Sequence, residues 1–187
     1  LFTLFSQLLG LVRDRLLVSA VGIGASLDVY YTAFRIPDFL YASVATLASV
    51  TVILPYLHQR YQSGDSNNLR VFISQVFSAL VIFLVAVSTV LFIIMPMLAP
   101  VIAPGFDQEQ LLTLISVSRI MLIQPILIGI SNMFGSVSQL FKKFFVVALS
   151  PVMYNVGIII GIVWLYPIYG AYGLAYGVVL GALLHLC

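Results

Sequence analysis

The sequence has very little charge. Its 187 residues include eight Lys or Arg and six Asp or Glu, so 7% of the chain is charged and 62% is apolar. A soluble domain carries about 25% charged residues, and a water-exposed surface cannot be built from so few. This composition excludes a cytosolic enzyme, a disordered chain and a secreted disulfide scaffold, and it predicts a polytopic membrane protein.

Cysteine, metal-ligand patterns and catalytic motifs are scarce as well. The one cysteine, Cys187, is the last residue, so no disulfide can form within the chain. Neither His58 nor His185 has a second ligand at metal spacing, and we expect surface or packing histidines. There is no Walker loop and no nucleophile with a base at a readable spacing, and a net charge of +2 is too small to indicate nucleic acid. We therefore expect no enzyme, no metal site, no cofactor and no nucleic-acid partner.

Apolar runs long enough to cross a bilayer occur six times. A membrane-spanning helix needs about 20 mainly apolar residues, and no run alternates polar and apolar residues as a barrel strand would. Pro96 is expected to end the third run. The fold class predicted is therefore all-α, with six transmembrane helices. The predicted spans are residues 1–21, 28–57, 71–95, 111–140, 144–165 and 171–187.

The cations of the predicted loops all fall on one side of the membrane. They lie in the second and fourth connections, and the other three connections hold no Lys or Arg. Since cytoplasmic loops are enriched in Lys and Arg, this side is predicted to be cytoplasmic. Six crossings then place both termini in the cytoplasm. The four loop cations are Arg60, Arg70, Lys142 and Lys143.

Half of the charges lie in or at the edges of the predicted helices. An ionised residue near the middle of the bilayer costs roughly 2.5–3.5 kcal/mol on an insertion scale, so these groups must face partners or water. Function is best sought among them. They are Arg13, Asp14, Arg15, Asp28, Arg35, Asp38 and Arg119.

Helical spacing groups several of these charges. Ser6, Gly10, Arg13 and Leu17 share one face of the first helix. In the second helix a polar stripe follows the same periodicity, which suits a hydrated cavity between helices better than lipid. This polar stripe comprises Asp28, Tyr31, Arg35 and Asp38, continued by Ala42, Thr46 and Ser49.

Pro37 lies within the second predicted helix, next to the polar stripe. It removes a backbone donor and leaves the carbonyl of Ala33 without its usual partner, so a kink is expected there.

Two interpretations of the charges within the helices remain open. In the first they pair with one another, because Asp14, Asp28 and Asp38 can neutralise three of the four arginines. In the second, Arg13 and Arg35 face an anionic ligand. Because a guanidinium can contact phosphate through two parallel hydrogen bonds, a phosphate-bearing substrate is chemically reasonable.

Other residues within the spans are expected to hold helices together. Asn132 and Asn155 are candidates for interhelical hydrogen bonds. Glycines four residues apart indicate close helix packing. These glycines are Gly157 with Gly161, and Gly173 with Gly177.

Two ordered strings near the start of the chain resemble a known family. Residues 5–14 read FSQLLGLVRD, which is similar to the first-helix signature F-S-R-x-x-G-x-x-R-D of the MurJ (MviN) lipid II flippases. Residues 28–38 read DVYYTAFRIPD and resemble the family's D-x-F-x-x-A-F-[KR]-[LI]-P-N. The resemblance covers essentially the whole chain. Its later landmarks are Pro55, residues 103–106, Arg119-Ile120 and residues 150–155.

The resemblance implies a transporter of the multidrug/oligosaccharidyl-lipid/polysaccharide (MOP) superfamily, with two six-helix lobes around a central cavity. This chain would be the N-terminal lobe, and the opening at Leu1 inside an apolar run agrees with a fragment. The family moves the lipid-linked peptidoglycan precursor to the outer leaflet of the bacterial cytoplasmic membrane by alternating access. The partners implied are a lipid-linked pyrophosphate substrate, membrane lipid and the second lobe.

The resemblance also suggests roles for individual residues. Arg13, Asp28 and Arg35 would line the cavity near the pyrophosphate. Arg119 is included among the expected cavity residues, and Pro37 would be a flexing point.

The chain departs from the family pattern at several charged positions. Gln7 replaces the first-helix arginine, Tyr41-Ala42 stand where an arginine pair is expected, and Thr46-Leu47 replace a glutamate-glycine. These departures leave two alternatives open. One is an exporter of another amphipathic or lipid-linked substrate, and the other is a non-transporting membrane scaffold whose polar stripe only holds helices together.

Overall fold

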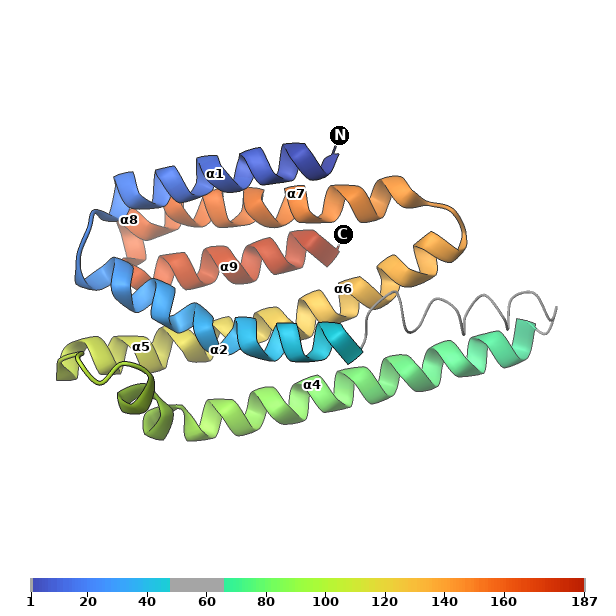
Figure 1. The fold of residues 1–187 in the computed structure, drawn as a ribbon, viewed down its shortest axis with the longest axis horizontal. Helices are drawn as coiled ribbons and strands as arrows, with labels where there is room; N and C mark the ends of the chain where they lie inside the picture. Colours follow the sequence, from blue (N-terminus) through green and yellow to red (C-terminus); the bar gives the residue numbers. More distant parts are fainter. Residues whose placement is uncertain (1, 48–65, 187) are drawn as a thin grey trace.

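The computed structural model describes residues 2–47 and 66–186, and every element in that part of the chain is a helix (Figure 1). Three helical stretches are long and apolar enough to cross a membrane: Asn67–Ile102, Gln108–Leu140 and Phe144–Tyr169. The all-α membrane fold is therefore confirmed. The elements are α1 (Phe2–Val21), α2 (Ala25–Leu47), α4 (Ser66–Ile102), α5 (Gln108–Met121), α6 (Ile123–Leu140), α7 (Phe144–Ile160), the π-helix η1 (Gly161–Leu165), α8 (Tyr166–Tyr169) and α9 (Ala171–Leu186).

The helices run roughly along one common axis. Helix α7 packs between α1 and α9, α2 lies on α5, and α4 lies on α6. Both ends of the described chain lie at the same end of the bundle (Figure 1), which is the arrangement that an even number of crossings produces. Residues 48–57 of the second predicted span, with Leu1, His58, Arg60 and Cys187, lie outside the described residues.

Helix α4 is longer than the predicted span of residues 71–95. It begins at Ser66 and ends at Ile102, so the prediction that Pro96 ends it was wrong. A proline inside a helix leaves the carbonyl four residues earlier without its backbone donor, here the carbonyl of Phe92. The side chain of Arg119 donates to that oxygen from Nε at 3.0 Å, so this group is satisfied and the helix continues.

The predicted span 111–140 consists of two consecutive helices, α5 and α6, which meet at Leu122. The backbone of Leu122 remains in the right-handed helical region (φ −62°, ψ −12°). Pro125, in the first turn of α6, has no N–H to donate to the carbonyl of Met121. The interruption is therefore a missing hydrogen bond rather than a loop.

The start of α5 is held by a capping box. The Asp107 side chain accepts from the Gln110 backbone N–H at 2.8 Å, and the Gln110 side chain accepts from the Asp107 N–H at 2.9 Å. Asp107→Ala should lower the free energy of unfolding by about 1 kcal/mol. Asp107→Asn should retain most of the stabilisation that the cap provides. Thermal unfolding of the purified full-length protein checks this. Equal losses for the two variants would show that the cap does not depend on the side-chain oxygen.

The predicted close packing of glycines is confirmed between α7–η1 and α9. Gly157 faces Gly181 and Gly161 faces Gly177, and at each of these positions an added Cβ would collide with the backbone of the opposite helix, which at Gly181 is the carbonyl oxygen of Tyr154. Gly173 lies equally close to the carbonyl of Leu165. Because their backbones touch, α7–η1 and α9 form one tightly packed helical hairpin.

Candidate functional site

The described residues of this lobe leave the first part of the polar stripe of α2 exposed. Asp28, Arg35 and Asp38 are exposed, and the side chain of Tyr31 is 47% exposed. The opposite side of the helix, represented by Ala33 at 0% exposure, belongs to the core. The helix therefore has one face buried against its own lobe and one charged face that needs water or another part of the protein.

A polar pocket of about 320 Å³ opens beside this stripe. It lies between α1, α2 and α7, and it brings two of the predicted cavity arginines, Arg13 and Arg35, to the same site. Asp28 does not line it and instead lies in the first turn of α2, where a carboxylate is stabilised by the helix dipole. The lining residues are Arg13, Asp14, Leu17, Tyr30, Tyr31, Phe34, Arg35, Asp38 and Tyr154.

Arg13 is bound within the lobe on two sides. Its Nε and Nη2 atoms donate to Oδ1 of Asp14 at 2.9 and 2.7 Å, and Nη1 donates to Oδ1 of Asn155 on α7 at 3.0 Å. The interpretation that charges pair internally therefore holds for Arg13 and Asp14. The guanidinium still lines the pocket, so its position there is fixed by neighbouring helices.

Asn155 connects this arginine to the packing of α1 on α7. Its Nδ2 donates to the backbone oxygen of Ser6 at 3.4 Å, to the Ser6 hydroxyl at 3.3 Å and to the Pro151 carbonyl at 2.9 Å. Gly10 lies on the same face of α1, and a Cβ there would be 3.8 Å from Oδ1 of Asn155. The predicted face of Ser6, Gly10 and Arg13 thus meets α7, and the predicted interhelical role of Asn155 is confirmed.

Arg35 differs from Arg13, which is held by hydrogen bonds within the lobe. Within residues 2–47 and 66–186 its guanidinium makes no hydrogen bond or ion pair, and the side chain is exposed. Besides the polar pocket, Arg35 borders an apolar cleft of about 640 Å³ between α2 and α4. This cleft is lined by Ile36, Phe39, Leu40 and Ser43 of α2 and by Phe83, Val87, Leu91, Ile94, Leu98 and Ile102 of α4.

Arg119 lies outside the polar pocket, on α5. Besides its hydrogen bond to the Phe92 carbonyl, its guanidinium lies 4.6 Å from the centre of the Phe92 ring. These contacts explain why α4 tolerates Pro96. The structure therefore gives Arg119 a contact that stabilises α4 and does not bring it together with Arg13 and Arg35.

The role of Arg119 can be tested with a double-mutant cycle. Arg119→Met should lower the free energy of unfolding by about 1–3 kcal/mol, because a carbonyl in the membrane loses its donor. In a Pro96→Ala background a backbone N–H at position 96 supplies the missing donor, so the same substitution should cost less. Thermal unfolding of the four full-length proteins measures the difference. Equal costs in both backgrounds would contradict the assignment.

Pro37 is buried on the core side of α2, and the helix bends near its middle (Figure 1). This agrees with the kink expected from the unpaired Ala33 carbonyl.

Several lining residues were not singled out from the sequence. Tyr30, which is 3% exposed, and Tyr154 of α7 both line the polar pocket. Their positions depend on how α1, α2 and α7 surround the pocket, and nothing local in the sequence marks them. Tyr41, which stands where an arginine was expected, accepts a long hydrogen bond of 3.5 Å from Nδ2 of Asn132. In the described part of the chain no three potential metal ligands gather.

Comparison with known proteins agrees with the architecture. The family model described as "Lipid II flippase MurJ" matches residues 17–187. A probable lipid II flippase MurJ from Haemophilus influenzae is 33% identical over 97% of this chain and 38% of its own length. A lipid II flippase MurJ from Burkholderia cenocepacia is 27% identical over 98% of this chain and 36% of its own length.

A solved structure has the same fold. It is described as lipid II flippase MurJ in an inward closed conformation, with a TM-score of 0.83, 24% sequence identity, and coverage of 99% of this chain and 39% of that one. The chain therefore spans less than two-fifths of the relatives compared. With the family model matching nearly its whole length, the chain belongs to the lipid II flippase MurJ family, a family of membrane transporters.

Proposed function

We propose that this chain is the N-terminal lobe of a flippase that carries lipid II, the lipid-linked peptidoglycan precursor, across the bacterial cytoplasmic membrane. The polar stripe of α2 faces the central cavity, and a second six-helix lobe, supplied by the remainder of the protein, closes the other side. Transport proceeds by alternating access, with the N-terminus in the cytoplasm as the loop cations indicate.

The position of Arg35 carries this proposal. Its guanidinium lies between a polar pocket and an apolar cleft, and no described residue neutralises it. A lone charge is costly inside a membrane, so a site of this kind needs an anionic ligand or water. A substrate with a pyrophosphate joined to a long hydrocarbon chain matches both sides of Arg35 at once.

The other site residues have distinct roles in this proposal. Arg13, held by Asp14 and Asn155, presents its remaining N–H groups to the pyrophosphate from a fixed position. Asp28, at the start of α2, pairs with different partners as the lobes rock. Pro37 is the point at which α2 flexes. Arg119 contributes by keeping α4 continuous.

A second candidate is an exporter of another amphipathic substrate on the same scaffold. It is favoured by Tyr41, which stands where the family pattern has an arginine. The Tyr41 hydroxyl accepts a hydrogen bond from Asn132 of α6, and the stripe lacks a cation at this position.

Complementation distinguishes these functions. The full-length protein is expressed in cells depleted of their own flippase, and lipid II in the outer leaflet is measured. Restored lipid II in the outer leaflet supports lipid II transport. A protein that inserts normally into the membrane but leaves no lipid II in the outer leaflet favours the other exporter.

The scaffold alternative needs a separate measurement. A cysteine at Ala42, which is exposed on α2, should react with an aqueous thiol reagent if the stripe faces a hydrated cavity. Protection of that cysteine would favour a non-transporting scaffold. Ser49, the next candidate position, lies outside the described residues.

A further inference from the structure

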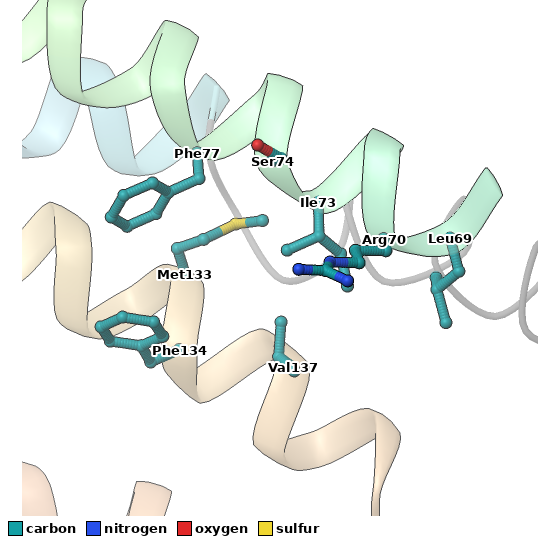
Figure 2. Close-up of a pocket in the computed structure, with 8 residues that line it drawn as sticks. All are labelled: Leu69, Arg70, Ile73, Ser74, Phe77, Met133, Phe134 and Val137. Atoms are coloured by element: carbon teal, nitrogen blue, oxygen red, sulfur yellow. The ribbon is translucent and has the colours of Figure 1, made fainter. Parts of the chain in front are cut away.

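A second apolar cleft lies between the beginning of α4 and the end of α6. Its volume is about 370 Å³, and its walls are almost entirely apolar (Figure 2). Phe77 and Phe134 lie against each other at one end of it, with ring centres 5.7 Å apart. The remaining lining residues are Leu69, Arg70, Ile73, Ser74, Met133 and Val137.

Arg70 brings a single charge into this cleft. Figure 2 shows its guanidinium projecting from α4 into the space in front of Val137. The side chain is exposed, and no described residue forms an ion pair or a hydrogen bond with it. An uncompensated arginine beside an apolar cleft indicates a ligand that carries both an anion and a hydrocarbon chain.

The position of Arg70 along α4 indicates the depth of this charge in the membrane. The helix opens with the polar residues Ser66, Asn67 and Asn68, and an uncharged apolar run begins at Val71. Arg70 therefore lies at the boundary between the polar and apolar parts, which corresponds to the headgroup level of a bilayer. Lys142 and Lys143 follow the end of α6, whose last turns face the beginning of α4, and they add positive charge at the same end of the lobe.

We propose that this cleft binds one anionic phospholipid from the leaflet on that side of the membrane. The phosphate pairs with Arg70, and an acyl chain packs between Ile73, Phe77 and Phe134. Basic pockets between transmembrane helices recognise anionic headgroups in this way. The cleft lies between α4 and α6, whereas the polar pocket lies between α1, α2 and α7. The lipid is therefore distinct from the transported substrate, and its binding does not depend on the proposed function.

The test measures lipid binding to the purified full-length protein. Phosphatidylglycerol and phosphatidylcholine with identical acyl chains are added to the delipidated protein in detergent, and bound lipid is counted by native mass spectrometry. We expect tighter binding of phosphatidylglycerol. Arg70→Gln should weaken that binding about fivefold, because one cation near the headgroups contributes about 1 kcal/mol. Ser74→Trp should also weaken it, by filling the cleft without changing the charge.

Matched controls distinguish a lipid bound in the cleft from lipids attracted by the charge of the protein surface. Arg15→Gln removes an exposed cation of α1, and Gln75→Trp adds the same bulk on α4 outside the cleft lining. Both should bind phosphatidylglycerol as the parent protein does. Equal binding of the two lipids by the parent would overturn the proposal. So would unchanged binding by Ser74→Trp, since the lipid would then be held by charge alone.

Discussion

Replacing Arg35 with glutamine is expected to reduce lipid II flipping by the full-length protein by about tenfold or more. Hydrogen bonds to charged groups contribute about 1.5–3 kcal/mol, and about 1.4 kcal/mol corresponds to a factor of ten. No described residue compensates for the guanidinium, so its loss falls on the ligand rather than on the fold. Arg35→Lys keeps the charge but not the two parallel donors, and it should give an intermediate rate. The amount of lipid II in the outer leaflet of flippase-depleted cells gives the flipping activity of the parent protein, Arg35→Gln and Arg35→Lys.

The control for this prediction is Arg15→Gln, the same chemical change at an exposed position of α1 that does not line the polar pocket. It should flip lipid II at the parent rate and reach the same level in the membrane. Arg13→Ala removes the hydrogen bonds to Asp14 and Asn155 as well, so its effect must be corrected for stability. Full activity of a protein carrying both Arg13→Ala and Arg35→Ala would contradict the roles proposed for them.

The orientation of α2 was predictable because periodicity alone determines which residues share a helical face. Residues 28, 31, 35 and 38 repeat every three to four positions, and the structure leaves that face exposed while Ala33 is buried. Burial follows from the same pattern, since a charged stripe cannot enter an apolar core without a cost of several kcal/mol. Local sequence therefore determines which face of this helix is exposed and which is buried.

The partners of individual charges could not be predicted in the same way. Arg13 meets Asn155 across 142 residues of chain, and Arg119 meets the carbonyl of Phe92 across 27. Spacing within one helix says nothing about which neighbouring helix supplies the acceptor. The continuation of α4 through Pro96 depends on such a distant donor, which is why a local rule for proline gave the wrong end.

A large effect on stability is expected at the glycine contacts between α7–η1 and α9. Gly161→Ala should lower the free energy of unfolding by about 1–3 kcal/mol, the usual cost of overpacking. The added methyl would collide with the backbone of Gly177, which cannot move aside as the end of a flexible side chain can. Larger side chains at position 161 should prevent accumulation in the membrane. Thermal unfolding of the purified full-length protein measures the first effect, and membrane protein levels measure the second.

Gly135→Ala on α6 is the matched control, because the chemical change is identical and the position is also helical. A Cβ there would lie 3.7 Å from a Val147 methyl, an ordinary contact. Alanine favours the helix over glycine by about 0.8–1.0 kcal/mol, so Gly135→Ala should be neutral or stabilising. The two substitutions therefore differ in sign only through the distance between α7–η1 and α9. If Gly161→Ala were as stable as Gly135→Ala, the two backbones could not lie in contact, and the hairpin that supports α1, Asn155 and Arg13 would have to pack differently.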